Sequence, residues 1–215
     1  MQCWILFKKN WKDLQNYKSP SVNSLQRNAM KMEIESNIIS PDSIEVVISH
    51  KKTPKIKLEG KLVNLPDFII TRMGGLIDYH SLFTLRFLEN LGIPIINSFK
   101  AINIVRDKFH TQLFLAEHDI PIIKTLLVKF PLNVDAIERE FGYPVILKTV
   151  FSTHANGVYL CENREQFTNF IQFLRSTRTE MPILIQEFIS ESKGQDIRVF
   201  VLGNEIKASM HRIGR

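Results

Sequence analysis

The apolar residues of the first hundred positions fall into short runs of strand length, separated by longer segments in which they recur with helical spacing. Strands are predicted over residues 3–7, 44–48, 68–71 and 93–96, a small hairpin over 55–58 and 61–63, and helices over 21–34 and 78–90. This alternation of strand and helix predicts a small open α/β domain, in which helices cover a largely parallel sheet.

The second half of the chain shows a different pattern, with pairs of strands adjacent in sequence. Residues 145–151 and 158–160 predict a hairpin that turns at Asn156-Gly157, and a second hairpin turns at Gly203-Asn204. Both dipeptides readily adopt the positive φ of tight hairpin turns. Further strands are predicted over 125–129 and 183–189, and helices from Ser98 to about residue 118, over 134–141 and over 164–174.

Lys148 interrupts the apolar strand 145–151 in its middle. An unpaired ammonium group in a buried strand is costly to desolvate, so it needs an anion or a path to water. The small polar loop 152–157 follows, and its backbone N–H groups are suited to surround a phosphate. Two interpretations stay open at this point: a phosphate site, or an exposed edge strand from which Lys148 extends into water.

Arg72-Met73-Gly74-Gly75 ends the predicted strand 68–71. In open α/β sheets, ligands bind beyond the carboxyl ends of the strands. Glycine allows a close approach of the backbone, and an arginine is suited to bind a carboxylate or phosphate. The alternative is a plain turn between strand and helix with a surface arginine.

The composition is that of an ordinary globular protein, with a formal net charge of +6. Part of this excess is a lysine cluster between positions 51 and 61, which predicts either a surface for anionic partners or simply a solvated hairpin face. The apolar runs are too short to span a bilayer, and the N-terminal residues lack the features of a signal peptide. The cysteines, Cys3 and Cys161, fit reduced core thiols of a cytoplasmic protein.

Taken in order, the motifs of the chain resemble one known family. Arg-Met-Gly-Gly ends a small α/β domain, Arg-Asp-Lys at 106–108 lies on a helix, and Lys148 lies on a strand with a covering loop. Gln-Glu-Phe-Ile at 186–189 then ends a strand, and Gly-Gln-Asp-Ile-Arg at 194–198 opens a hairpin. From residue 44 onward this order resembles the ATP-grasp superfamily, specifically its RimK-type glutamate ligases.

The resemblance implies an α/β (α+β) fold in four parts. These are a pre-ATP-grasp domain over 1–97, a connecting helix over 98–119, the small ATP-grasp lobe and hinge over 120–190, and the start of the large lobe over 191–215. It also implies residue roles. The residues implied to bind ATP are Lys108 and Lys148 at the phosphates, Ser152, Thr153, His154, Asn156 and Gly157 in the covering loop, Gln186, Glu187 and Phe188 at the adenine, and Asp196 at the ribose. Arg72 and Gly74 are implied to face the substrate, and Arg198 and Arg212 to act in catalysis.

The implied activity is that of an ATP-dependent carboxylate–amine ligase that works through an acyl-phosphate. It joins an amino acid, with glutamate implied, to a carboxylate on a peptide, protein or small molecule. Lysines, arginines and Mg²⁺ or Mn²⁺ neutralise the transferred phosphoryl group. The family's metal-binding acids follow the Asp-Ile-Arg hairpin, whereas the sequence stops at Arg215, so no metal ligand is assigned and the isolated chain is expected to be inactive or very weak. Relatives often self-associate, which makes a homo-oligomer a further expectation.

Two other functions compete with this one. A non-catalytic module that binds ATP or a partner in the same pocket predicts ATP affinity without turnover. A basic protein that binds nucleic acid or associates with ribosomes predicts steeply salt-dependent binding. The lysine cluster has no interleaved aromatic residues to stack on bases, which disfavours nucleic acid as a partner.

Overall fold

The computed structural model describes residues 1–8, 19–50, 55–74, 77–150, 157–177 and 182–214. The chain divides into two compact units, Met1–Phe114 and Leu115–Arg215, and each is considered by itself. The four-part division expected from the sequence stays a prediction. The predicted mixed α/β architecture is confirmed, because the first unit contains a parallel sheet beside helices and the main sheet of the second unit is antiparallel.

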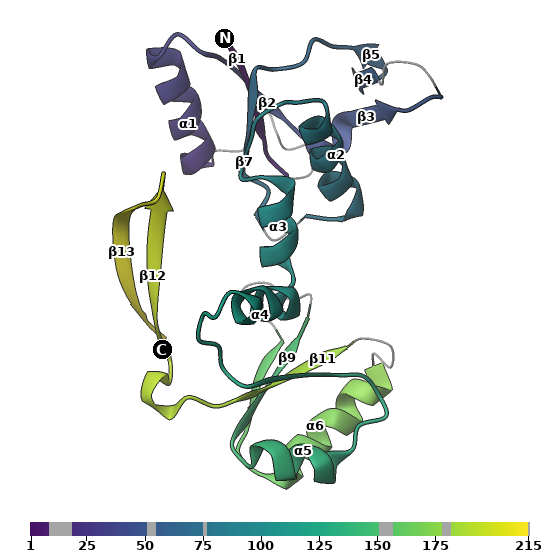
Figure 1. Ribbon diagram of the computed structural model, residues 1–215, viewed down its shortest axis with the longest axis vertical. Helices are drawn as coiled ribbons and strands as arrows, with labels where there is room; N and C mark the ends of the chain where they lie inside the picture. Colours follow the sequence, from purple (N-terminus) through teal and green to yellow (C-terminus); the bar gives the residue numbers. More distant parts are fainter. Residues whose placement is uncertain (9–18, 51–54, 75–76, 151–156, 178–181, 215) are drawn as a thin grey trace. The chain divides into compact units, whose positions relative to one another are not determined.

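A four-stranded parallel sheet in the order β2-β1-β6-β7 forms the centre of the first unit (Figure 1). Its strands are β1 (Gln2–Leu6), β2 (Glu35–Ile39), β6 (Phe68–Thr71) and β7 (Ile95–Ile96), and its longer helices are α1 (Pro20–Lys31) and α2 (Tyr79–Asn90). Successive side chains of a strand point to opposite faces. Cys3 and Ile5 therefore pack with Val22 of α1 on one face, whereas Trp4 and Leu6 pack with the buried leucines of α2 on the other.

Strand β2 is absent from the strands expected from the sequence. Its residues Glu-Ser-Asn-Ile-Ile begin with three polar side chains, so the segment shows neither an apolar run nor an alternation. Tertiary pairing holds it in place instead. Glu35 N donates to Met1 O at 3.0 Å, and Ile39 O accepts from Phe7 N at 3.0 Å. The strand therefore joins the sheet through its backbone and contributes apolar contacts only through Ile38 and Ile39.

A small antiparallel sheet follows, made of β3 (Ile44–Val47), β4 (Lys55–Leu58) and β5 (Lys61–Leu62), with the 3-10 helix η2 (Pro41–Ser43) before it. The predicted hairpin turn is confirmed, with φ of 50° at Glu59 and 80° at Gly60. Lys55, Lys57 and Lys61 of the lysine cluster lie on this sheet, whereas Lys51 and Lys52 lie outside the described residues.

The helix predicted from Ser98 to about residue 118 is divided into α3 (Phe99–Arg106) and α4 (Lys108–Glu117). Asp107 between them has an extended backbone, with φ −103° and ψ 118°. Its Oδ1 accepts from Phe109 N at 2.8 Å and from His110 N at 3.0 Å. Aspartate is among the preferred N-cap residues because it satisfies these first N–H groups. The Arg-Asp-Lys motif therefore marks a helix boundary, and Lys108 is the first residue of α4.

The second unit contains a four-stranded antiparallel sheet in the order β10-β9-β11-β8. Its strands are β8 (Thr125–Val128), β9 (Val145–Thr149), β10 (Val158–Cys161) and β11 (Ile183–Glu187), and its helices are α5 (Val134–Phe141) and α6 (Arg164–Thr177). Both helices lie on the same side of this sheet (Figure 1). The predicted β9–β10 hairpin is confirmed, although residues 151–156 of its loop lie outside the described residues.

The last described element is a long hairpin of β12 (Gln195–Leu202) and β13 (Glu205–Ile213), which follows the 3-10 helix η4 (Ser190–Ser192). Its predicted turn is confirmed, with φ of 59° at Gly203 and 65° at Asn204. Two successive positive φ angles are those of a type I′ turn, which matches the twist of the flanking strands. Every residue of both strands is exposed.

Candidate functional site

The sheet of the second unit has one face directed to helices α5 and α6. Val145 and Leu147 of β9 and Ile183 and Ile185 of β11 belong to the same buried cluster as Phe167 of α6. Because side chains alternate along a strand, the residues between them point to the opposite face. We call this the Lys148 face; its residues on the two central strands are Ile146, Lys148, Leu184 and Gln186.

Lys148 lies on a central strand of the sheet. Strand β9 pairs with β10 on one side and β11 on the other, so the alternative that Lys148 extends from an edge strand is wrong. Its neighbours in register are Val158 and Leu184, and its side chain is half-buried. The sheet therefore places the amine of Lys148 between two apolar side chains.

Gln186 lies on the same face and carries a polar atom without a described partner. The residue is 3% exposed, and its Nε2 donates to Thr125 Oγ1 at 2.7 Å. Thr125 Oγ1 in turn donates to Ile123 O at 3.0 Å, which fixes the orientation of the amide. Oε1 is buried and finds no hydrogen-bond partner among the described residues. A buried acceptor in this state costs about 1–3 kcal/mol, so the site fits a ligand that donates a hydrogen bond.

The carboxylate of Glu187, the next residue, is used elsewhere. By alternation it lies on the face of Ile185, and its Oε1 accepts from Lys124 N at 2.8 Å. The Glu187 N–H also donates to Lys124 O at 3.2 Å. This pair of bonds ties the end of β11 to the start of β8. The structure therefore separates the side chains of Gln186 and Glu187, and half-buried Phe188 follows beyond the strand end.

Of the other residues expected at the phosphates, Lys108 belongs to the first unit. Burial lowers the pKa of its ammonium group, and the neighbouring Asp107 carboxylate opposes this shift. Gly157, with φ of 85°, ends the covering loop, and its O accepts from Thr149 N at 3.1 Å. The loop residues Ser152, Thr153, His154 and Asn156 lie outside the described residues.

The hairpin brings three of the predicted charged residues to one of its faces. Asp196 and Arg198 are two apart on β12, and Arg212 is the register partner of Asp196 on β13. Asp196 Oδ1 accepts from Arg212 Nε at 2.6 Å, and Asp196 Oδ2 accepts from a terminal nitrogen of the same guanidinium group. These hydrogen bonds lower the pKa of Asp196 and raise that of Arg212. The acid expected at the ribose and the arginine expected in catalysis therefore form one bidentate pair.

In the first unit, Arg72 lies directly after β6 at the carboxyl end of the parallel sheet. Its N–H donates to Leu6 O at 2.8 Å, and its exposed guanidinium group donates to Ser21 Oγ at 3.4 Å. Gly74 has φ of 59°, a conformation that favours glycine. The strand end expected from the sequence is confirmed, and the role of both residues at a substrate stays a prediction.

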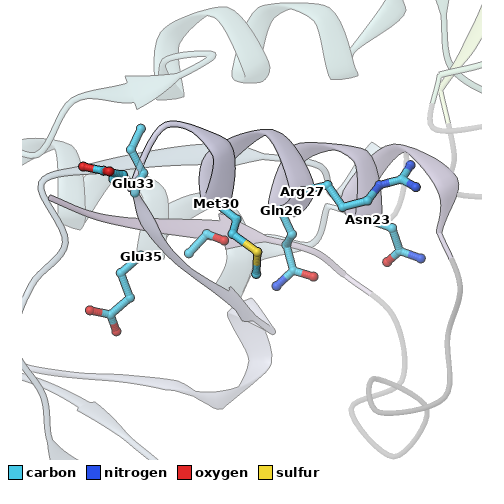
Figure 2. A pocket seen from close by; sticks show the side chains of 8 residues that line it. Asn23, Gln26, Arg27, Met30, Glu33 and Glu35 are labelled. Atoms are coloured by element: carbon cyan, nitrogen blue, oxygen red, sulfur yellow. The ribbon is translucent and has the colours of Figure 1, made fainter.

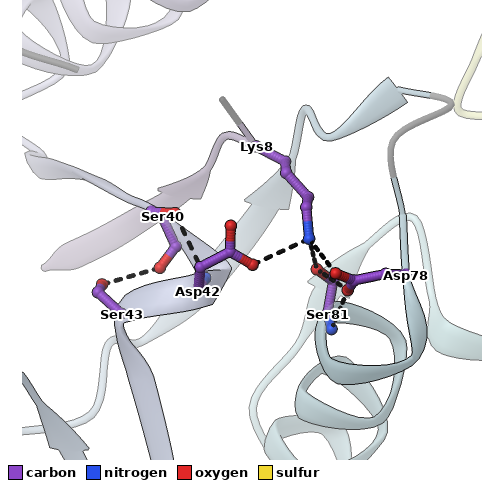
Figure 3. Close-up of polar contacts among 6 residues, drawn as sticks. All are labelled: Lys8, Ser40, Asp42, Ser43, Asp78 and Ser81. Atoms are coloured by element: carbon purple, nitrogen blue, oxygen red, sulfur yellow. Dashed lines mark hydrogen bonds and ion pairs between the residues drawn. The ribbon is translucent and has the colours of Figure 1, made fainter. Parts of the chain in front are cut away.

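Sequence reasoning did not identify an ion cluster at this same end of the sheet. Lys8 follows β1, and its Nζ donates to Asp42 Oδ1 at 2.9 Å, Asp78 Oδ2 at 2.6 Å and Ser81 Oγ at 2.9 Å (Figure 3). All three ammonium protons are thus used. Burial alone would lower the pKa of Lys8, but the hydrogen bonds to Asp78 and Asp42 raise it, and the bond from Lys8 lowers the pKa of Asp78. One sequence signal could have pointed to this cluster: Asp78 lies at the start of a predicted helix, where it caps α2 by accepting from Ser81 N.

The polar groups of the Lys148 face fit ATP, because they combine an amine with a buried amide oxygen that has no hydrogen-bond partner among the described residues. The described residues do not fit a magnesium site in the same way: no three of their His, Cys, Asp or Glu side chains gather where they could hold a metal ion. No helix in the described part of the chain is long and apolar enough to cross a membrane.

The chain matches two family models over most of its length. Residues 105–215 match the RimK-like ATP-grasp domain, and residues 14–102 match the RimK PreATP-grasp domain. Among solved structures, it is similar to a RimK domain protein ATP-grasp from Sphaerobacter thermophilus, with a TM-score of 0.71 and 18% identity over 97% of this chain and 72% of that one. The ATP-grasp ligase PsnB complexed with minimal precursor has a TM-score of 0.63 and 18% identity over 99% of this chain and 75% of that one.

Curated relatives agree with these matches. A probable alpha-L-glutamate ligase of Coxiella burnetii is 33% identical over 91% of this chain and 64% of its own length. A probable alpha-L-glutamate ligase of Rhodopirellula baltica is 35% identical over 74% of this chain and 39% of its own length. The chain thus spans less than two thirds of either relative. The resemblance noted in the sequence is confirmed, and the chain belongs to the RimK-like ATP-grasp family, with a RimK PreATP-grasp domain before its ATP-grasp region.

Proposed function

We propose that this protein is an ATP-dependent carboxylate–amine ligase that joins glutamate to a carboxylate of a peptide or protein acceptor. Family membership supports the ligase chemistry, and the names of the two curated relatives support glutamate as the amino acid. A peptide acceptor is supported by the ligase PsnB, which has a similar fold and was also solved with a precursor peptide. The observation that carries the proposal is the presence of Lys148 and Gln186 on one face of one sheet.

ATP supplies the γ-phosphoryl group that turns the acceptor carboxylate into an acyl-phosphate, which the amine then attacks with release of phosphate. The protein's task is to hold the phosphates and neutralise their charge. Lys148 would serve this purpose from the centre of the sheet. The Oε1 atom of Gln186 would accept a hydrogen bond from the exocyclic amine of adenine, which would satisfy an acceptor that has no partner in the described part of the chain.

The remaining residues extend the proposed site. Lys108 and the loop 152–157 would add contacts to the phosphates, with Glu187 and Phe188 at the adenine. Asp196 would face the ribose, and Arg198 and Arg212 would face the acidic substrate or the transferred phosphate. The Asp196–Arg212 ion pair would then belong to both the ribose subsite and the substrate subsite. Both cysteines are buried free thiols, which supports a cytoplasmic location.

Thermal unfolding with and without Mg-ATP tests the proposal in the wild type, Lys148→Ala and Arg139→Ala. Arg139 lies exposed on α5, on the other side of the sheet, so its removal changes the net charge equally and serves as the control. A bound ligand raises stability by about 2.7 kcal/mol at a hundredfold excess over Kd. We expect Mg-ATP to stabilise the wild type and Arg139→Ala, and to leave Lys148→Ala nearly unchanged.

Each variant is compared with its own unfolding temperature without ATP, so a loss of intrinsic stability in Lys148→Ala does not affect the result. If Mg-ATP stabilises Lys148→Ala as much as the wild type, the assignment of the phosphates to the Lys148 face is wrong. If it stabilises neither the wild type nor Arg139→Ala, the proposal of an ATP-dependent activity for this chain fails.

A further inference from the structure

The edge strand of the first sheet has backbone groups that no described residue uses. In a parallel pair, the N–H and C=O groups of alternate residues point to the same neighbour. Glu35 and Ile39 of β2 bond to the β1 side, through Met1 O and Phe7 N respectively. Ser36 and Ile38 therefore direct their N–H and C=O groups away from β1, to the side where no strand of the described sheet follows.

A groove of about 630 Å³ lies along this edge (Figure 2). One wall is a stripe of helix α1 at helical spacing, and the floor is the turn into β2. The residues that line it are Asn23, Gln26, Arg27, Met30, Glu33, Ile34, Glu35 and Ser36. Met30 is 78% exposed and Ile34 is half-buried, and the other residues of the lining are polar. Such a lining suits a partner that is recognised mainly through its backbone.

Charges are separated along the groove. Glu33 and Glu35 lie at the end where β2 begins, and Arg27 lies towards the other end, beside Asn23 (Figure 2). Because β1 and β2 are parallel and α1 connects them, α1 runs antiparallel to β2, and its N-terminus lies near the end of that strand.

We propose that this groove binds an extended peptide segment of the acceptor, which adds to the sheet as a fifth strand parallel to β2. Ser36 and Ile38 would bond its backbone, a carboxylate in its C-terminal part would meet Arg27, and a cationic group in its N-terminal part would meet Glu33. The acceptor role rests on the proposed ligase function, whereas the binding of a peptide does not.

The dimensions agree with a short segment. The stripe from Asn23 to Met30 spans seven residues of helix, or about 10 Å at 1.5 Å per residue. An extended strand covers this length in about three residues. A peptide segment of three residues is therefore long enough to bond the outward backbone groups of both Ser36 and Ile38.

A second copy of the chain fits the same edge less well. A twofold axis would pair the two β2 strands antiparallel and bring the α1 stripe against its own copy. That stripe is polar except for Met30, whereas stable subunit interfaces have an apolar core. The separated charges of Arg27 and Glu33 match a polar peptide of fixed direction.

The test is an NMR titration of the full chain, without ATP, against the unlabelled peptide Lys-Thr-Val-Thr-Glu-Glu and its charge-reversed counterpart Glu-Glu-Thr-Val-Thr-Lys. The backbone amides of Ser36 and Ile38 report binding directly. Ser36→Pro removes an N–H that the sheet does not use, and proline is tolerated at such edge positions. Ser36→Thr is the matched control, because it keeps the N–H. Arg27→Glu reverses one end of the groove on an exposed helix position.

We expect the first peptide to shift both amides, to bind about tenfold more weakly to Ser36→Pro, and to bind Ser36→Thr normally. Arg27→Glu should weaken binding of the first peptide, because its C-terminal glutamates then face a glutamate of the groove. The proposal is overturned if neither peptide shifts these amides, or if a folded Ser36→Pro binds as the wild type does. It is also overturned if sedimentation shows a wild-type dimer that Ser36→Pro dissociates, because the edge then pairs with a second copy. If the chain binds the peptide but is not stabilised by Mg-ATP in the thermal unfolding test, only the ligase proposal is refuted.

Discussion

Asp196 and Arg212 lie opposite each other on the two strands of the C-terminal hairpin and form a bidentate ion pair. Family resemblance gives them separate roles, one at the ribose and one in catalysis. Because each neutralises the other in this structure, neither is available to a ligand as an isolated charge. A ligand that engages one of them also changes the surroundings of its partner.

This pairing predicts that substitutions of the two residues are not independent. Asp196→Asn and Arg212→Gln should each weaken ATP binding, and the double variant should lose less affinity than the product of the two single losses. The reason is that each single change already disrupts the shared pair. Titration calorimetry of the four proteins measures the coupling. His211→Ala is the control, because His211 pairs in register with Ile197 on the other face of the hairpin; two independent, multiplicative losses would contradict the shared role.

A second prediction concerns the pH dependence of this pair. The hydrogen bonds from Arg212 hold the pKa of Asp196 below its ordinary range. The carboxylate therefore stays ionised, and the pair intact, as the pH falls to about 4. In Arg212→Gln this support is lost, so Asp196 should become protonated at a higher pH than in the wild type. Carbonyl-carbon NMR of the aspartates checks the direction; an unchanged pKa of Asp196 in the variant would show that the pair does not persist in solution.

Gln186 gives a third prediction, in which stability and affinity separate. Gln186→Leu removes a buried acceptor that has no described partner and also removes the bond to Thr125 Oγ1. The first change stabilises by about 1–3 kcal/mol and the second destabilises by about 1 kcal/mol, so the variant should unfold at or above the wild-type temperature. ATP affinity should fall, because the acceptor for the adenine amine is gone. A variant that keeps full ATP affinity would remove Gln186 from the site.

The sequence anticipated the strands that carry an apolar run, and through them the position of Lys148 and the two hairpins. It did not anticipate β2, because Glu35, Ser36 and Asn37 give no apolar signal and the strand depends on backbone pairing with β1. It also missed the ion cluster of Lys8, whose carboxylate partners are 34 and 70 residues distant along the chain. Contacts of this kind depend on how the elements are packed, and local periodicity carries no trace of them.

The Lys8 cluster predicts a specific loss of stability. Lys8→Met should lower the free energy of unfolding at pH 7 by about 1–2 kcal/mol, because it leaves Asp42 and Asp78 facing each other without the cation. This value lies between those of exposed and buried ion pairs, because Lys8 is largely buried whereas the side chains of both acids are about half exposed, at 42% and 55%. Urea unfolding of Lys8→Met and of Lys31→Met, an exposed lysine of α1, measures the difference. If the two variants had the same free energy of unfolding, the Lys8 cluster would contribute nothing to stability.

The same cluster fixes a dependence on pH. The pKa of Asp78 is lowered in the folded protein, so its contribution is fully present above the ordinary aspartate pKa, about 4, and is lost as the pH falls below that value. The pKa of Lys8 is raised, so its contribution is present below about 10.4 and is lost as the pH rises through the raised value. Lys8→Met should therefore show a weaker loss of stability in acid than the wild type. If the stability of Lys8→Met and of the wild type fell by the same amount in acid, that loss would come from other carboxylates.

The break between α3 and α4 gives the last prediction, because one side chain there has two separable effects. Asp107 caps α4 by accepting from Phe109 N and His110 N, and its charge opposes the lowering of the pKa of Lys108 by burial. Asp107→Asn keeps an acceptor oxygen and removes the charge, whereas Asp107→Ala removes both. Loss of the cap costs about 1 kcal/mol, so Asp107→Ala should be less stable than Asp107→Asn by that amount. Both variants should lower the pKa of Lys108 further, which NMR of ¹³C-methylated lysines measures. If Asp107→Asn alone left that pKa unchanged, the carboxylate would act on Lys108 through helix geometry and not through its charge.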